Sequence, residues 1–90
     1  MLERRVTVIN ELGLHARAAA QVVKKAREFS SRILLKHEVT GFTANAKSIL
    51  SLLYLAAATG VSLVISAEGP DEDAALEAIV ALFENGFGEL

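Results

Sequence analysis

The sequence predicts an α+β fold: an open-faced β-sandwich with a four-stranded, mainly antiparallel sheet and three helices on one face. Four short runs alternate apolar and polar residues, which is typical of strands with one buried face. Three longer runs repeat apolar residues at helical spacing, and the order of elements is β-α-β-β-α-β-α. Helices with one strong apolar stripe pack economically as a single layer, which leaves the other face of an antiparallel sheet to solvent.

Residues 5–9 alternate and predict the first strand, because Val6 and Val8 then share its core face. Residues 16–29 follow a short loop and predict the first helix. Apolar residues recur there every three or four positions, the repeat of a helix with one buried side. The predicted buried stripe consists of Ala19, Val22, Val23, Ala26 and Phe29.

Residues 32–37 and 42–46 predict two strands that pair as a hairpin. The turn between them spans residues 38–41, and Gly41 suits a backbone with positive φ. His37, beside this turn, is interpreted as a surface histidine without a catalytic role. The core side of the first hairpin strand carries Ile33 and Leu35.

Residues 47–58 predict a second helix, which Thr59 and Gly60 would end. Its apolar side chains go almost all the way round, so in a small domain one apolar side must face water. Exposed apolar patches often mark partner sites. The apolar residues of this helix are Ile49, Leu50, Leu52, Leu53 and Leu55.

Residues 61–68 predict the fourth strand, and a Gly-Pro-Asp turn then leads into the last helix. Asp71 suits the N-cap of that helix, and Gly86 suits its C-terminal cap. We expect residues 87–90 to form a short tail. The buried stripe of the last helix consists of Leu76, Ile79, Val80 and Phe83.

Composition limits the classes of function that the chain can serve. Ninety residues fit a single domain, 1–90, and 52% hydrophobic residues suffice for a small core. The chain has no cysteine, and its two histidines lack clustered carboxylates, so we expect no metal and no cofactor. No signal peptide precedes the first strand, and the longest apolar-rich run, 49–58, is too short to insert into a membrane. We therefore expect a cytoplasmic protein.

Charge is distributed unevenly along the chain. Residues 1–47 hold all nine Lys and Arg residues and four acidic residues, whereas residues 48–90 hold seven acidic residues and no basic one. The first helix can therefore carry a basic face that suits a phosphorylated or acidic partner. An ordinary solvated helix face explains the pattern equally well. A nucleic-acid partner is not expected, because no aromatic residues alternate with the basic ones and the pI is about 5.6.

The junction before the first helix combines groups that attract anions. Gly13 marks the turn, His15 falls at the N-cap position, and Arg17 lies in the first helical turn. Unpaired N–H groups and the positive end of the helix dipole favour a phosphate there. The same positive surroundings disfavour imidazolium, so we expect a neutral, nucleophilic His15. These features suggest a histidine that is itself phosphorylated, although a simple capping or solvated histidine remains the alternative.

Three motifs together resemble one known family. The motifs are Gly13-Leu14-His15-Ala16-Arg17, Lys47-Ser48-Ile49-Leu50 and Ile65-Ser66-Ala67-Glu68-Gly69. With them, the chain is similar over almost its whole length to HPr, the histidine-containing phosphocarrier of the bacterial phosphoenolpyruvate-dependent phosphotransferase system. Two departures from the family pattern are present: Ala18 occupies the position of the family's usual proline, and the hairpin turn at 38–41 is about two residues longer than usual.

The resemblance implies a carrier rather than an enzyme. His15 would accept a phosphoryl group on a ring nitrogen, Nδ1 or Nε2, from enzyme I and pass it to the A-component of a sugar permease. Ala16, Arg17 and Ala18 would bind the phosphate. Ser48 matches a serine that a dedicated kinase phosphorylates, and a phosphorylase dephosphorylates, in some bacteria. The implied partner surface of this monomer consists of Ala16, Arg17, Ala20, Gln21, Lys24, Arg27, Ile49, Leu50 and Leu53.

Two other interpretations stay open at this point. A carrier of the nitrogen-linked phosphotransferase branch would use the same chemistry with different partners. A small-ligand-binding regulatory domain on a similar α/β sandwich would use His15 only as a helix cap. The residues do not specify the sugars or permeases served, nor whether Ser48 is phosphorylated in the cell.

Overall fold

The computed structural model describes all residues, Met1–Leu90. Its elements follow the predicted order and end in one additional short turn of 3₁₀ helix, η1. The strands are β1 (Leu2–Thr7), β2 (Arg32–His37), β3 (Thr43–Asn45) and β4 (Ser62–Glu68). The helices are α1 (Ala16–Ala26), α2 (Ile49–Leu55), α3 (Glu72–Glu84) and η1 (Gly86–Gly88).

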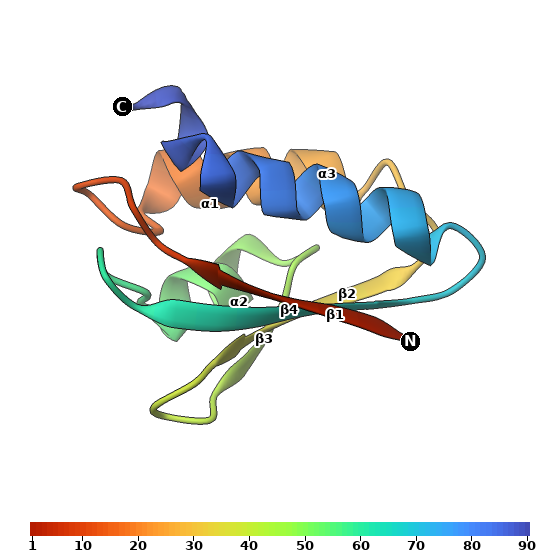
Figure 1. The fold of residues 1–90 in the computed structure, drawn as a ribbon. Coiled ribbons are helices and arrows are strands. Elements are labelled where there is room, and N and C mark those ends of the chain that lie inside the picture. Colours follow the sequence, from red (N-terminus) through yellow and green to blue (C-terminus); the bar gives the residue numbers. More distant parts are fainter.

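The four strands form one antiparallel sheet in the order β1-β4-β2-β3. The register places core residues side by side, with Val6 opposite Leu63, and Leu35 between Ile65 and Ala44. Helices α1 and α3 lie beside each other across one face of the sheet, and the short α2 lies nearer β3 (Figure 1). The predicted fold class is therefore confirmed.

Strand β1 is displaced towards the N-terminus relative to the prediction. It begins at Leu2 and ends at Thr7, instead of spanning residues 5–9. Consecutive charged residues conceal its start in the sequence, but their backbones pair with β4 as regularly as the rest. Val8, beyond the strand, still donates to Val61 O and accepts from Gly60 N–H, and its side chain is buried as expected.

Helix α1 ends three residues before the predicted end at Phe29. The backbone tightens there, because Glu28 and Phe29 donate to carbonyls three residues back instead of four. The predicted stripe still faces the core, and Phe29 packs against it half-buried. The periodicity therefore identified the buried face correctly but not the change of helix type.

Helix α2 is much shorter than the predicted segment 47–58. It ends at Leu55 because Ala56 adopts a left-handed backbone, with φ of +52°, rather than at Thr59-Gly60. Leu52 and Leu55 are buried, and the other side of the helix faces water as predicted. The exposed apolar side chains of α2 are Ile49, Leu50, Leu53 and Tyr54.

The prediction that His37 is a surface histidine is wrong. Its exposed fraction is 8%, and its Nδ1 accepts from the N–H groups of Val39 and Thr40 at 3.2 and 3.3 Å. The ring thus fixes the start of the hairpin turn, where Gly41 has the expected positive φ of +77°. His37 supports the turn that precedes β3 and has no catalytic partner there.

Asp71 stands at the N-cap position of α3, but its side chain does not cap that helix. Its carboxylate instead accepts from the backbone N–H groups of Ser30 and Ser31 and from the Ser31 hydroxyl. These bonds hold the pKa of Asp71 below its usual value. Glu72, the first residue of α3, accepts from the N–H of Gly69, which lies before the helix. The Asp71 carboxylate therefore joins the turn before α3 to the start of β2.

We predict that Asp71→Asn lowers the stability of the fold at neutral pH. The depressed pKa in the folded state means that ionised Asp71 contributes stability above its unfolded pKa, about 3.9. That contribution is lost as the pH falls through the folded pKa. Denaturant unfolding at a series of pH values should show a deficit at pH 7 that disappears in acid.

Asp73→Asn is the matched control, because Asp73 lies exposed in the first turn of α3 without a bond to Ser31. Equal unfolding midpoints for Asp71→Asn and the control at every pH would contradict the prediction.

Candidate functional site

His15 is the N-cap of α1, as the sequence predicted. Its backbone is extended, with φ of −77° and ψ of −178°, and its carbonyl accepts the first intrahelical hydrogen bond from Ala19 at 2.8 Å. Its Nδ1 accepts from Arg17 N–H at 3.3 Å. The ring therefore lies over the end of the helix where N–H groups are unpaired and the dipole is positive.

The loop before His15 is held against the connection that follows α2. Leu14 N–H donates to Ala57 O at 2.8 Å, and a Cβ on Gly13 would lie 2.6 Å from that same oxygen. Gly13 also has a φ of +66°, which other residues rarely adopt. The turn that presents His15 therefore requires glycine both for its backbone angle and for the close approach.

Glu89, which no sequence motif indicated, contacts His15 directly. Glu89 Oε2 is 2.6 Å from His15 Nε2, and its other oxygen accepts from the Asn10 side-chain amide at 3.0 Å. The same amide donates to Gly13 O at 2.8 Å. The His15 side chain is 25% exposed and that of Glu89 12% exposed. The site is thus partly covered by the end of the chain.

The residues after α3 are not a free tail, so this prediction is wrong. Asn85 caps α3, and the chain then turns through η1, in which Phe87 has a φ of +57°. Phe87 is 5% exposed and packs edge-on against Phe83, with ring centroids 4.9 Å apart. Gln21 donates to Phe87 O at 3.4 Å. The end of the chain therefore returns to the start of α1 (Figure 1).

This geometry determines which nitrogen of His15 carries the proton and which has the lone pair. Hydrogen bonds from His15 and Asn10 hold the pKa of Glu89 below its usual range, so Glu89 is ionised at neutral pH. An ionised carboxylate only accepts, so Nε2 of His15 carries the proton and donates to Glu89. Nδ1 accepts from Arg17 N–H and therefore has the lone pair. The nucleophilic nitrogen faces the helix end.

The groups expected to bind phosphate lie at the same end of α1 as His15. The backbone N–H groups of Ala16 and Ala18 donate to no other group of the protein, so both remain available at the start of α1. The Arg17 side chain is 72% exposed, and its guanidinium lies 3.7 Å from Glu89 Oε2. Ala18 buries its methyl group completely while its N–H stays free. The sequence thus located these three residues correctly, and their binding role stays a prediction.

Several of the predicted partner residues lie where α1 and α2 meet. Leu50 is 75% exposed, and Arg27 donates to Lys47 O at 3.1 Å, which links the end of α1 to the residues before α2. A groove between the two helices joins basic and apolar side chains in one surface. It is lined by Ala20, Val23, Lys24, Arg27 and Ile49.

Ser48 is the N-cap of α2, whereas the predicted helix, 47–58, included it in the first turn. Its hydroxyl oxygen accepts from Ser51 N–H at 3.3 Å. Ile49 and Leu50 follow directly and expose their side chains. A phosphate on Ser48 would therefore stand at a helix start and beside exposed apolar side chains.

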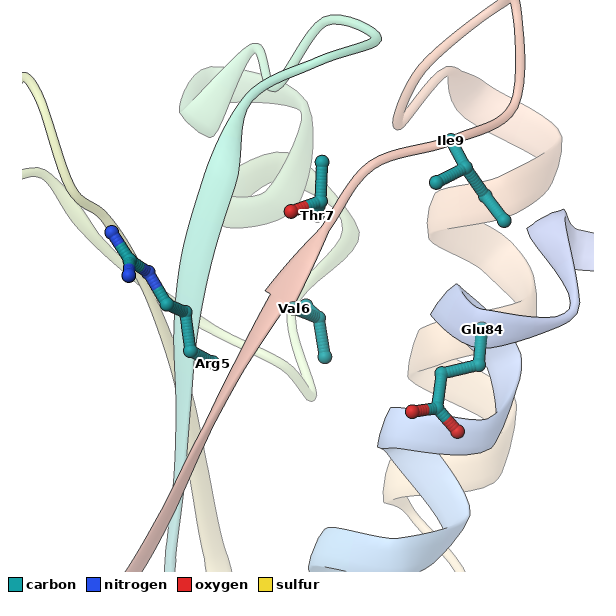
Figure 2. Close-up of a pocket in the computed structure, with 5 residues that line it drawn as sticks. All are labelled: Arg5, Val6, Thr7, Ile9 and Glu84. Atoms are coloured by element: carbon teal, nitrogen blue, oxygen red, sulfur yellow. The ribbon is translucent and has the colours of Figure 1, made fainter.

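A separate hollow lies between β1 and α3, away from the predicted site residues (Figure 2). The side chains of Val6, Ile9 and Glu84 point into it, whereas Arg5 extends away and pairs with Glu38. A carboxylate among apolar side chains offers nothing to hold an anion. No cluster of three His, Cys, Asp or Glu side chains could hold a metal ion, and no helix has the length and apolar character needed to cross a bilayer.

Comparison with known families decides the relationship that the motifs suggested. The family described as "PTS HPr component phosphorylation site" matches residues 2–85. The chain belongs to the HPr family. Its general function is therefore that of a phosphocarrier of a phosphotransferase system.

Individual HPr-family relatives match over nearly their whole length. "Phosphocarrier protein HPr" of Cupriavidus necator is 43% identical over 99% of this chain and 98% of its own. "Phosphocarrier protein NPr" of Escherichia coli is 38% identical over 98% and 97%. A crystal structure of HPr from Thermoanaerobacter tengcongensis has a TM-score of 0.93 and 41% identity, and it covers 100% of this chain and 99% of that one.

The free N–H of Ala18 leads to a prediction about phosphate retention. Ala18→Pro should raise the melting temperature slightly, because proline lowers the conformational entropy of the unfolded chain and so stabilises the fold by about 0.4–1 kcal/mol. The same change removes one donor at the helix start. Phosphorylated Ala18→Pro protein should then lose its phosphate faster, by up to about ten-fold, since a bond to a charged group is worth about 1.5–3 kcal/mol before water competes.

The measurement is the half-life of the phosphorylated protein at fixed pH. Ala18→Gly serves as the control, because it keeps the N–H while changing the side chain. A proline variant that holds its phosphate as long as the wild type would show that the Ala18 donor does not act on the phosphoryl group.

Proposed function

We propose that the protein carries a phosphoryl group on Nδ1 of His15. The observation that supports this most strongly is the orientation of the ring: Nε2 is occupied by Glu89, and the lone pair of Nδ1 faces the start of α1. Two free backbone donors lie at the same helix start, and the Arg17 guanidinium lies 3.7 Å from the Glu89 oxygen that contacts Nε2. Such a combination of donors and positive dipole suits a phosphoryl dianion.

Loading is the transfer of a phosphoryl group from a nucleophilic atom of the donor to Nδ1 of His15. The Nδ1 lone pair attacks phosphorus, the new N–P bond forms, and the bond to the donor breaks with its electron pair remaining on the donor. Arg17 reduces the charge on the transferred group, and the N–H groups of Ala16 and Ala18 bind its oxygens. Because the protein only accepts and releases the group, we place it as a carrier and not as an enzyme.

The proposed donor is enzyme I, and the proposed acceptor is the A-component of a sugar permease. The groove between α1 and α2 supports this assignment, because it combines exposed apolar side chains with Lys24 and Arg27. A partner with an apolar patch and an acidic rim would match it. We further propose that residues 1–90 act as one monomeric domain in the cytoplasm.

A carrier of the nitrogen-linked branch is the second candidate. Relatives named NPr support it, among them the Escherichia coli protein and one from Proteus mirabilis that is 42% identical. Both branches would use the same site with different partners. Rates of phosphorylation by the enzyme I of each branch, measured side by side, would separate them. A rate at least ten-fold higher with one enzyme would assign the branch.

We predict that His15→Ala abolishes phosphorylation by enzyme I and phosphoenolpyruvate. The fold should persist, because losing an N-cap costs only about 0.5–2 kcal/mol. Mass spectrometry would detect an acid-labile gain of one phosphate in the wild type and none in the variant. His37→Asn is the control, since its amide oxygen can replace the buried Nδ1 acceptor.

Loss of phosphorylation in His37→Asn but not in His15→Ala would overturn the assignment. A folded wild-type protein that gains no phosphate from either enzyme I would favour the small-ligand-binding alternative.

We propose Ser48 as a site of regulatory phosphorylation and predict that Ser48→Asp slows loading by enzyme I roughly three- to ten-fold. Aspartate is a good N-cap, so α2 should remain intact while a negative charge appears beside Ile49 and Leu50. Ser48→Asn keeps the cap without the charge and is the matched control. Equal loading rates for the two variants would count against Ser48 as a switch.

A further inference from the structure

The contact between Glu89 and His15 orients the neutral ring, and it gains a second function if the ring becomes charged. A neutral imidazole with its proton on Nε2 needs no counter-ion, yet the carboxylate lies 2.6 Å away and is 12% exposed. Asn10, which is fully buried, fixes the second carboxylate oxygen through its amide. The buried Asn10 therefore holds the Glu89 carboxylate where it can act as a counter-ion, which the neutral ring does not need.

The phosphorylated ring does need a counter-ion. When Nδ1 forms a bond to phosphorus and Nε2 keeps its proton, the imidazole becomes a cation. Release of the phosphoryl group needs the same proton: an acceptor nucleophile binds phosphorus, the P–Nδ1 bond breaks, and its electron pair returns to Nδ1. With the proton on Nε2 the ring leaves as neutral imidazole, whereas without it the ring would leave as an unfavourable imidazolate anion.

We propose that Glu89 is a positioning residue for phosphoryl transfer, whose carboxylate keeps the proton on Nε2 and balances the positive charge of the phosphorylated His15 ring. The inference rests on the proposed carrier function. It assigns to the end of the chain a part in the reaction, although Glu89 lies 74 residues from His15 in sequence. Its role resembles that of a carboxylate behind a catalytic histidine, which orients the ring and stabilises its charged form.

Other charged groups near the ring set the size of the expected effect. Arg17 from α1 and the positive end of the helix dipole disfavour a cationic ring, and the phosphoryl group itself favours one. Glu11, from the loop before α1, lines a shallow hollow together with Arg17 and Glu89 but forms no bond to His15. Loss of the Glu89 charge should therefore matter more than loss of the Glu11 charge.

The experiment compares wild type, Glu89→Gln and Glu11→Gln after phosphorylation by enzyme I and phosphoenolpyruvate. Glutamine keeps the shape of the side chain and removes its charge. ¹⁵N and ³¹P NMR would follow the loss of the Nε2 proton from the phosphorylated ring as the pH rises. Glu89→Gln should lower the midpoint by about one pH unit, at the low end of the effect of a nearby opposite charge. Glu11→Gln should leave the midpoint within a few tenths of a unit.

Phosphoryl transfer to an acceptor protein gives a second measure. At a pH above both midpoints, a shift of one unit reduces the protonated fraction ten-fold, so Glu89→Gln should transfer about ten-fold more slowly than Glu11→Gln. At a pH below both midpoints the two rates should agree within about two-fold. A merely structural role would lower the rate equally at every pH.

The outcomes separate this inference from the carrier function. If all three proteins are phosphorylated but share one midpoint and one pH profile, Glu89 has no such role and the carrier function stands. If the wild type takes no phosphate from enzyme I, the carrier function fails, and this inference fails with it.

Discussion

The close approach of Gly13 to the carbonyl of Ala57 determines where the site can form. This contact fixes the last turn of the loop before α1, and Leu14 N–H donates a hydrogen bond to the same oxygen. The carbonyl is available because Ala56 leaves the helical conformation and ends α2 early. His15 therefore begins α1 at a point set by the end of α2, so the nucleophile and the exposed apolar side of α2 are held in one rigid arrangement.

The same end of the molecule also receives the terminus of the chain. Phe87 packs against Phe83 and accepts from Gln21, and these contacts return Glu89 to the start of α1. Burial of one phenyl ring contributes about 1.5–3 kcal/mol, enough to order a short segment that would otherwise fray. Two features that read as unrelated in the sequence, a helix-starting histidine and a C-terminal glutamate, thus become neighbours through one apolar anchor.

Periodic patterns in the sequence predicted the features that depend on interactions between residues close together in the chain. The bounds of β2 and the buried stripes of α1 and α3 follow from alternation and helical spacing, and the N-cap position of His15 follows from the break between two such patterns. Long-range contacts decided the rest. The segment after α2 is held by the hydrogen bond from Leu14 N–H to Ala57 O, and the position of Glu89 depends on Phe87. An apolar residue after a helix cap, as Phe87 is, was the signal that the tail would return to the body.

The exposure of the site suits a carrier better than a storage site. Arg17 is largely exposed, so water and salt screen its attraction for a bound phosphate. The backbone donors of α1 and the half-covered His15 ring add directional stabilisation without enclosing the group. A buried cage of charges would bind a phosphoryl group far more tightly and would oppose its release. Because a carrier must both receive and release the group, a few fixed donors beside one exposed cation meet both requirements.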